Sequence, residues 1–243
     1  FAGGKMKSIR GEGGPTRTLA WVQNAWGGSW SQNGDILFAP HVTERVWRVS
    51  SSSGNAPVEV TRLLSSQSSH SSPWFLPDGR HFLYRATGPA EGRGVYLGSL
   101  DSPEATRLID DDSAAVYAPP GFLVFARQGR LLAQRFNLET LALTGQTFVV
   151  AEPPSYKGED FRCSAVTGTL VYRDGSGTER QLAWLDRTGK LIELVGDPYA
   201  PSAIGMDLSP DGTRLVVGRA TEGNWDILSL ETARSGATRL TND

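Results

Sequence analysis

A turn that ends in glycine recurs five times along the 243-residue chain, each time just before a short apolar segment. The turn glycines are spaced by 45, 42, 47 and 44 residues, at Gly34, Gly79, Gly121, Gly168 and Gly212. The apolar segments that follow them are residues 36–38, 82–84, 123–125, 170–172 and 215–217. A period in the forties with several strands in each repeat is typical of a β-propeller, in which one repeat forms one blade. A single repeat is too small to bury its own apolar faces, so the repeats must stack on one another.

Four segments of each repeat have the pattern of a β-strand. In the repeat that contains Gly79 they are residues 73–75, 82–84, 95–97 and 106–109. The second segment is apolar, as expected for a strand whose two faces are covered by neighbouring blades. The fourth segment, residues 58–64 in the first full repeat, alternates more and carries arginine. Such charge is typical of an outer edge strand, because it discourages pairing with other chains. We therefore predict four-stranded antiparallel blades and no helix of useful length.

The repeat predicts an all-β chain with a single β-propeller domain over residues 1–243. Its expected parts are a partial blade at 1–20 and full blades at 21–66, 67–110, 111–154, 155–198 and 199–243. Residues 5–9 and 16–19 have the pattern of the third and fourth strands of a blade, and neither end of the chain supplies the first two. We therefore expect an incomplete fragment of a ring of about six to eight blades.

Composition excludes several classes of partner and site. The formal net charge of −2 gives no reason to expect a nucleic-acid partner. No apolar run approaches the roughly 18 to 20 residues of a membrane helix, so this segment itself is not expected to contact a membrane. Cys163 is the only cysteine, which rules out an intrachain disulfide and a zinc site built from thiolates. We expect no cofactor.

The sequence shows no arrangement typical of a catalytic site. The histidines are His41, His70 and His81, and no Gly-x-Ser-x-Gly nucleophile elbow occurs. The single acidic run, residues 110–112, suits a solvated connector, with a weak calcium site as the alternative. We therefore assign no catalytic or metal-binding residue and expect that this segment is not an enzyme.

Two turns resemble the S-P-D-G repeat of TolB-type, WD-repeat-like β-propellers. Residues 76–84 read Leu-Pro-Asp-Gly-Arg-His-Phe-Leu-Tyr, and residues 209–217 read Ser-Pro-Asp-Gly-Thr-Arg-Leu-Val-Val. A longer ordered set of segments is similar to the propeller region of bacterial receptor-like serine/threonine protein kinases: residues 1–5, 27–30, 75–84, 95–101 and 116–121. In that family the propeller follows a cytoplasmic kinase domain and a membrane helix, so the resemblance implies a place outside the cytoplasm, in the periplasm or at the cell surface.

The chain departs from this pattern in two respects. The third and fourth repeats lack the Asp-Gly turn, and residues 119–121 and 166–168 take its place. No kinase element is present: the chain has no Gly-rich phosphate loop followed by a strand lysine, no His-Arg-Asp and no Asp-Phe-Gly. Any kinase activity would therefore belong to another part of the polypeptide.

Candidate binding residues come from the connections between blades. In a propeller the loops from a fourth strand to the next first strand rim one mouth of the central channel, where ligands and partner peptides commonly bind. In or beside these loops lie His70, Trp74, Tyr117, Arg162 and Tyr199. We predict that they bind an unknown protein, peptide or small molecule, with structural packing as the alternative interpretation.

Three functional hypotheses follow. The first is a non-catalytic sensor or scaffold domain of a receptor-like kinase. The second is a propeller that gates substrate for a prolyl-oligopeptidase-like peptidase. The third is a free periplasmic TolB-like protein-interaction module. The fold alone does not choose between them.

Overall fold

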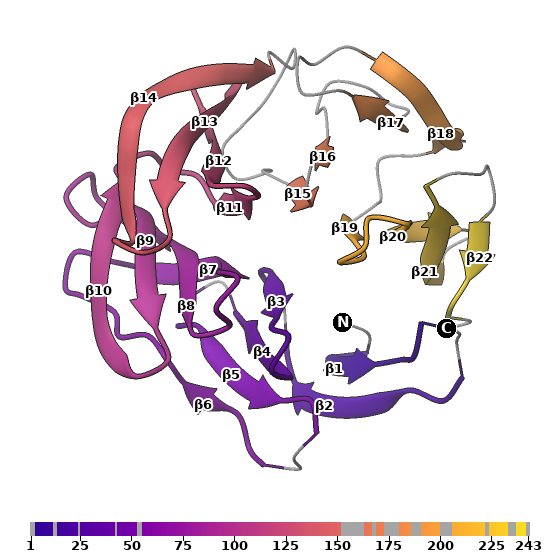
Figure 1. Cartoon of the computed structure of the whole chain (residues 1–243). Helices are drawn as coiled ribbons and strands as arrows, with labels where there is room; N and C mark the ends of the chain where they lie inside the picture. Colours follow the sequence, from indigo (N-terminus) through magenta and orange to yellow (C-terminus); the bar gives the residue numbers. More distant parts are fainter. Residues whose placement is uncertain are drawn as a thin grey trace. The chain divides into compact units, whose positions relative to one another are not determined.

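The structure is a computed structural model that describes residues 3–11, 14–23, 25–41, 43–52, 55–151, 163–166, 169–172, 180–185, 191–199, 206–221, 224–232 and 237–241. Within these ranges the chain forms strands and turns and no helix. Its antiparallel sheets are those of a β-propeller, which confirms the predicted fold class (Figure 1).

Four of the sheets contain four antiparallel strands in sequence order. The first comprises β3 (Gly28–Trp30), β4 (Asp35–Phe38), β5 (Trp47–Ser50) and β6 (Val58–Glu59). The second comprises β7 (Ser69–Phe75), β8 (His81–Thr87), β9 (Gly94–Ser99) and β10 (Ser102–Ile109). The third comprises β11 (Ala115–Ala118), β12 (Phe122–Arg127), β13 (Arg130–Asn137) and β14 (Ala142–Ala151). The fourth comprises β19 (Met206–Leu208), β20 (Arg214–Thr221), β21 (Asn224–Glu231) and β22 (Ala237–Arg239).

The other strands form two-stranded antiparallel sheets. One comprises β1 (Lys5–Ser8) and β2 (Arg17–Trp21), where the sequence predicted the last two strands of a blade. The fourth repeat appears as two hairpins, which are β15 (Cys163–Val166) with β16 (Thr169–Tyr172), and β17 (Arg180–Leu185) with β18 (Leu191–Tyr199).

The chain divides into two compact units. The first unit holds residues 1–9 and 15–117, and the second holds residues 10–14 and 118–243. The predicted single domain and the predicted blade limits stay predictions.

The core of the first unit explains why the second strand of a repeat is apolar throughout. Ile36 and Phe38 of β4 pack into one buried cluster together with Met6 and Ala20 of the β1–β2 hairpin. Leu37, on the opposite face, belongs to a second buried cluster with aromatic side chains of the next sheet. Successive side chains of a strand point to opposite faces. Both faces of β4 are therefore covered, as predicted. In the second unit, β19 to β21 share a smaller buried cluster of Leu208, Leu215, Val217 and Leu230.

The fourth strand of the first full repeat is shorter than predicted. The sequence predicts a strand over residues 58–64, but β6 ends at Glu59. The Val60 N–H still donates to the Val46 carbonyl oxygen at 2.9 Å, and the Val46 N–H then donates to the Thr61 side-chain Oγ1, also at 2.9 Å. A side-chain oxygen thus takes the place of the next backbone acceptor, and the chain leaves the sheet. The last sheet repeats this arrangement, since the Ile227 N–H donates to Thr241 Oγ1 at 2.9 Å.

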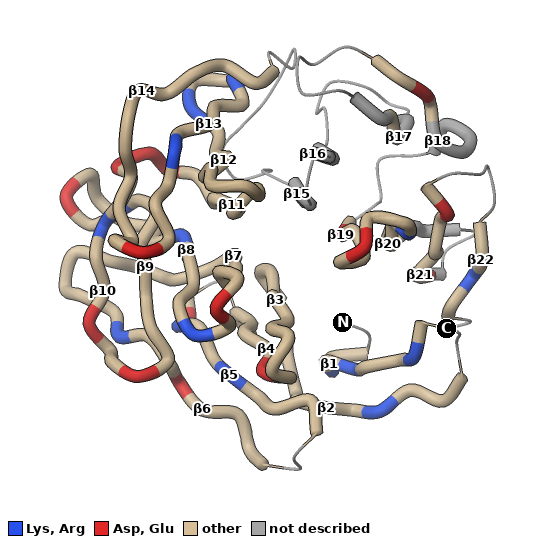
Figure 2. The backbone as a smooth tube through the Cα atoms, in the orientation of Figure 1, with Lys and Arg blue, Asp and Glu red and all other residues tan. Residues whose placement is uncertain are grey.

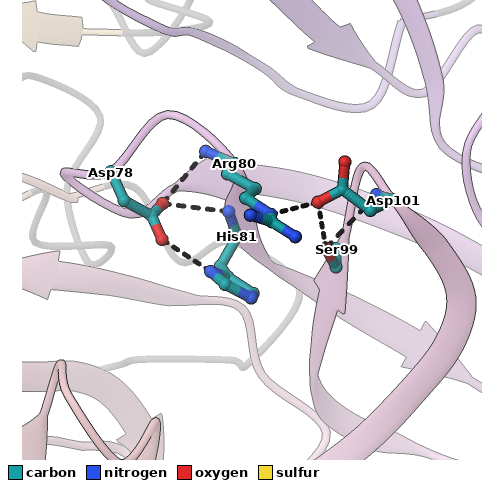
Figure 3. Close-up of polar contacts among 5 residues, drawn as sticks. All are labelled: Asp78, Arg80, His81, Ser99 and Asp101. Atoms are coloured by element: carbon teal, nitrogen blue, oxygen red, sulfur yellow. Dashed lines mark hydrogen bonds and ion pairs between the residues drawn. The ribbon is translucent and has the colours of Figure 1, made fainter.

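The Asp-Gly turn between β7 and β8 is held by its own side chains (Figure 3). Asp78 Oδ1 accepts the backbone N–H groups of Arg80 and His81 at 3.0 and 2.9 Å, and Oδ2 lies 2.5 Å from His81 Nδ1. Burial raises the pKa of Asp78, but the hydrogen bonds from His81 and Arg80 outweigh it and lower the pKa overall. Arg80 forms an ion pair with Asp101, which joins this turn to the turn between β9 and β10.

Candidate binding site at the start of β7

Three consecutive polar residues are buried where β7 begins. Ser69, His70 and Ser71 are 6%, 0% and 5% exposed. Burying a polar group costs free energy unless the group is hydrogen-bonded, so the partners of these side chains determine what the site can do. Ser69 Oγ lies 2.7 Å from Thr87 Oγ1 on the paired strand β8. Because neighbours on a strand point to opposite faces, His70 and Ser71 reach different surroundings.

His70 lies in a directed chain of hydrogen bonds. Its Nε2 is 3.0 Å from Gln67 Oε1, which can only accept, so Nε2 carries the proton. Nδ1 therefore accepts, at 2.8 Å, the hydroxyl proton of Thr61, whose oxygen already accepts the Val46 N–H. The Gln67 Nε2 group donates onward to the Gly92 carbonyl oxygen at 3.3 Å. When His70 is neutral, both of its ring nitrogens, the Thr61 hydroxyl and the Gln67 amide all have hydrogen-bond partners in this series.

Burial and charge both keep His70 neutral. Burial is the larger cause and Arg45 is the second, and together they lower the pKa of His70 to about 4. The imidazole ring lies 4.6 Å from the ring of Tyr84, which stacks at 5.6 Å on Tyr96. Burial raises the pKa of Tyr84, with a smaller contribution from Tyr96. His70 is thus a structural core residue whose two nitrogens are both engaged.

The opposite face of the same hairpin carries an ion pair between a buried arginine and a partly exposed aspartate. Ser71 lies directly opposite Arg85 in the β7–β8 register, so both side chains share one face. Arg85 is only 6% exposed. Its Nη2 and Nε lie 2.7 and 2.8 Å from Oδ1 of Asp112, in the loop after β10. The Asp112 side chain is 42% exposed, so one oxygen binds the guanidinium while the carboxylate still reaches solvent.

A β-bulge positions this face. The β7–β8 register shifts between Ser71 and Trp74, and Ser72 has a positive φ of 50°. The Ser72 N–H donates to the Trp26 carbonyl oxygen at 2.8 Å. Gly27, which follows Trp26, has φ +97°, and a Cβ added there would lie 2.8 Å from Ser72 Cα. The loop before β3 therefore supports the bulge by a contact that only glycine permits.

We call Ser69, His70, Ser71, Arg85 and Asp112 the β7 polar cluster. Of the five predicted binding residues, only His70 belongs to it, inside β7 rather than in the preceding loop. Trp74 is half-buried on β7, opposite Leu83. Tyr117 is buried on β11, and burial raises its pKa. Tyr199 ends β18, opposite Arg180, and Arg162 lies outside the described residues.

Two members of the cluster, Arg85 and Asp112, could have been recognised from the sequence. Arg85 directly follows the apolar segment 82–84, in a strand expected to be covered on both faces, where an arginine needs a buried partner. The acidic run at 110–112 supplies that partner. In the described part of the chain no group of three or more His, Cys, Asp or Glu side chains is placed to hold a metal ion, so the alternative of a calcium site gains no support here.

The described contacts of the cluster are hydrogen bonds and one ion pair. Ser71 Oγ is buried, and among the described residues it has no hydrogen-bond partner. His70 points to the other face with both nitrogens occupied. What reaches solvent is the Asp112 carboxylate, held in place by a buried guanidinium. A fixed, exposed carboxylate accepts N–H donors from a bound molecule.

Comparison with known proteins identifies the fold and no family. No family model matches the sequence, and no curated protein matches it. Among solved structures, TolB from Acinetobacter baumannii has a TM-score of 0.72 at 17% identity, with 97% of this chain and 59% of that chain covered. The chain thus spans 59% of the length of that TolB. A chain of the nidogen/laminin complex has a TM-score of 0.70 at 10% identity, covering 96% of this chain and 88% of its own.

A peptidase is also among the similar structures. The puromycin-hydrolysing peptidase of Mycobacterium tuberculosis has a TM-score of 0.64 at 12% identity, with 96% of this chain and 49% of that chain covered. The TM-scores establish a shared β-propeller fold, and the low identities establish nothing beyond it. The described residues contain no helix long and apolar enough to cross a membrane.

Proposed function

We propose that this chain is a non-catalytic recognition propeller that binds a protein or peptide at the exposed Asp112 carboxylate of the β7 polar cluster. The observation that carries the proposal is the Arg85–Asp112 pair, which presents an exposed carboxylate from a rigid, buried support. Binding residues on a rigid scaffold lose little conformational freedom when a partner arrives. The N–H donors that suit this carboxylate are backbone amides of an extended segment or a lysine or arginine side chain.

The larger protein in this proposal is a bacterial receptor-like serine/threonine kinase. The ordered sequence segments that resemble the propeller region of such kinases support this assignment. In this arrangement the propeller is the sensor or scaffold outside the cytoplasm, and its bound state reaches the kinase through a membrane helix. A free TolB-like interaction module would use the same surface without the kinase.

A peptide array tests the recognition surface. The purified propeller is probed with extended peptides that contain one lysine and with the same peptides carrying glutamine instead. We expect selective binding of lysine peptides, weakened at least threefold by Asp112→Asn and by high salt. Glu104→Gln is the matched control, because Glu104 is an exposed carboxylate near the start of β10, whereas Arg85 is level with Ile109 at the end of that strand. Equal binding by both peptide sets, or robust turnover of a substrate by the propeller alone, would contradict the proposal.

A second candidate function is supported by the peptidase among the similar structures. In this alternative the propeller gates access to a separate hydrolase domain, and catalysis belongs to that domain. The two functions predict different flanking domains in the same polypeptide. An α/β-hydrolase segment favours the peptidase, whereas a kinase domain with a membrane helix favours the receptor.

A further inference from the structure

Three side chains from three neighbouring strands meet on one face of the third four-stranded sheet. Phe122 begins β12, Arg135 lies directly opposite it on β13, and Phe148 lies on β14 opposite Ala133. Alternate residues of a strand point to the same face, so Arg135 and Ala133 share one face with both rings. We call Phe122, Arg135 and Phe148 the aromatic–arginine patch.

The members of the patch hold one another in place. The guanidinium carbon of Arg135 lies 5.1 Å from the centre of the Phe122 ring. Phe148 packs edge-to-face on the same ring, with the two ring centres 5.6 Å apart. Phe148 itself lies between the two register shifts of the β13–β14 pairing. Arg135 is nevertheless exposed, and Phe148 is 50% exposed, so the patch is a preformed surface rather than a part of the core.

The guanidinium of Arg135 lacks an acidic partner. Strands β12, β13 and β14 contain no aspartate or glutamate, and Figure 2 shows blue on β13 and tan along β14. In the described part of the chain the Arg135 side chain forms no hydrogen bond and no ion pair. A guanidinium stacked on a ring still presents the N–H groups at its edge, and these form a fork that fits a carboxylate. A carboxylate is therefore the group that complements this surface.

Two other cations in the described ranges lie over aromatic rings, and neither offers the same combination. Arg127 lies over Phe125 at 5.5 Å on the other face of the hairpin, but Phe125 is fully buried and leaves no apolar surface free. Lys5 lies over Trp21 at 4.4 Å, but its ammonium has no planar fork. The aromatic–arginine patch joins a fork of donors to a second, exposed ring. Arginine and aromatic residues are the types enriched at the centres of protein interfaces.

We propose that the aromatic–arginine patch binds an extended segment of a partner protein in which an acidic residue and an aromatic residue lie two positions apart. The carboxylate pairs with Arg135, and the aromatic ring packs on Phe148. Phe148 is level with Ala133, two positions from Arg135 along β13. Side chains two positions apart on an extended segment point to the same side with a similar offset of about 7 Å.

The charge of the patch favours a peptide over a nucleic acid. Nucleic acids are bound by several cations that follow the phosphate backbone, whereas the patch has one arginine in a chain of net charge −2. The patch belongs to the second unit and the β7 polar cluster to the first. The proposal therefore does not depend on recognition at Asp112.

Fluorescence anisotropy with labelled peptides tests the proposal on the unmodified protein. The first peptide places one glutamate and one phenylalanine two positions apart in a background of serine and glycine. The other three place them at adjacent positions, replace the glutamate by glutamine, or replace the phenylalanine by serine. We expect the first peptide to bind at least fivefold more tightly than each of the others, and less tightly as salt is raised. Equal affinities, no binding of any peptide, or tighter binding of a single-stranded oligonucleotide overturns the proposal.

Two pairs of variants locate the binding. Arg135→Gln should weaken the first peptide at least tenfold and remove the preference for glutamate over glutamine. Arg62→Gln, which removes an exposed arginine of the first unit, is its control and should leave both unchanged. Phe148→Ala should weaken binding at least fivefold. Val149→Ala, which shortens a 44% exposed apolar side chain on the opposite face of β14, should not. Equal losses in a variant and its control contradict the proposal.

Discussion

His70 Nδ1 lies 2.8 Å from Thr61 Oγ1, and the same hydroxyl oxygen accepts the backbone N–H of Val46 at 2.9 Å. One threonine thus ends the fourth strand of one sheet and donates its hydroxyl proton to a histidine on the first strand of the next. Thr61 therefore contributes both to the hydrogen bonding of one sheet and to the buried side chains of the next.

The neutral state of His70 predicts a loss of stability in acid. Burial first, and Arg45 second, lower the folded pKa to about 4, whereas an unfolded histidine titrates near 6.5. Between these pH values the unfolded chain binds the proton more readily, so the free energy of unfolding falls as the pH drops from about 6.5 to 4. The full difference corresponds to roughly 3 kcal/mol. Urea denaturation at several pH values measures it. His70→Gln should flatten the slope in this window, and an unchanged slope would mean that His70 is not its source.

Thr61→Val should destabilise the fold by about 1–3 kcal/mol. The valine has nearly the same shape but offers no oxygen, so the buried Val46 N–H and His70 Nδ1 both lose their partner. Thr106→Val is the control, because Thr106 is exposed on β10. Urea denaturation of both variants measures their free energies of unfolding. Equal stabilities would show that the shared hydroxyl does not contribute.

Asp112→Asn should cost about 1–2 kcal/mol, because it leaves the buried guanidinium of Arg85 without its counter-charge. The exposure of Asp112 makes the loss smaller than for a fully buried pair. Replacing both partners, as in Arg85→Met with Asp112→Asn, should recover part of the loss. A double-mutant cycle measures this coupling. Additive effects would indicate that the two side chains do not interact in solution.

Gly27→Ala should destabilise the protein more than Gly14→Ala. Both glycines have a positive φ, +97° and +113°, so both substitutions carry backbone strain. Only at Gly27 would the new Cβ meet a backbone atom, 2.8 Å from Ser72 Cα. At Gly14 no atom lies within 4 Å. The difference in thermal midpoint therefore isolates the contact that supports the β7 bulge. If Gly14→Ala is as damaging as Gly27→Ala, the contact is unimportant.

Much of the fold was predictable from the sequence because the repeat is a local pattern. Turn glycines, apolar second strands such as residues 36–38 and charged edges depend on residues close together in the chain. The shortened β6 was not predictable in this way, because the strand ends where the Thr61 side chain meets Val46, fifteen positions away. β7 begins at Ser69, earlier than the predicted strand at residues 73–75. This too depends on residues distant in the sequence, because His70 pairs with Ala86 of β8 and its side chain bonds to Thr61.

The binding site depended still more on tertiary structure. The sequence by itself determined that the chain forms repeated antiparallel blades with apolar central strands, since turn chemistry and strand periodicity act locally. It also named His70 as a candidate binding residue and residues 110–112 as the single acidic run, read as a solvated connector. Only the tertiary structure decided that His70 is a neutral core residue and that Asp112 is the counter-charge of Arg85. The partners of a buried polar group come from other strands and loops, and burial gives each contact its energetic weight.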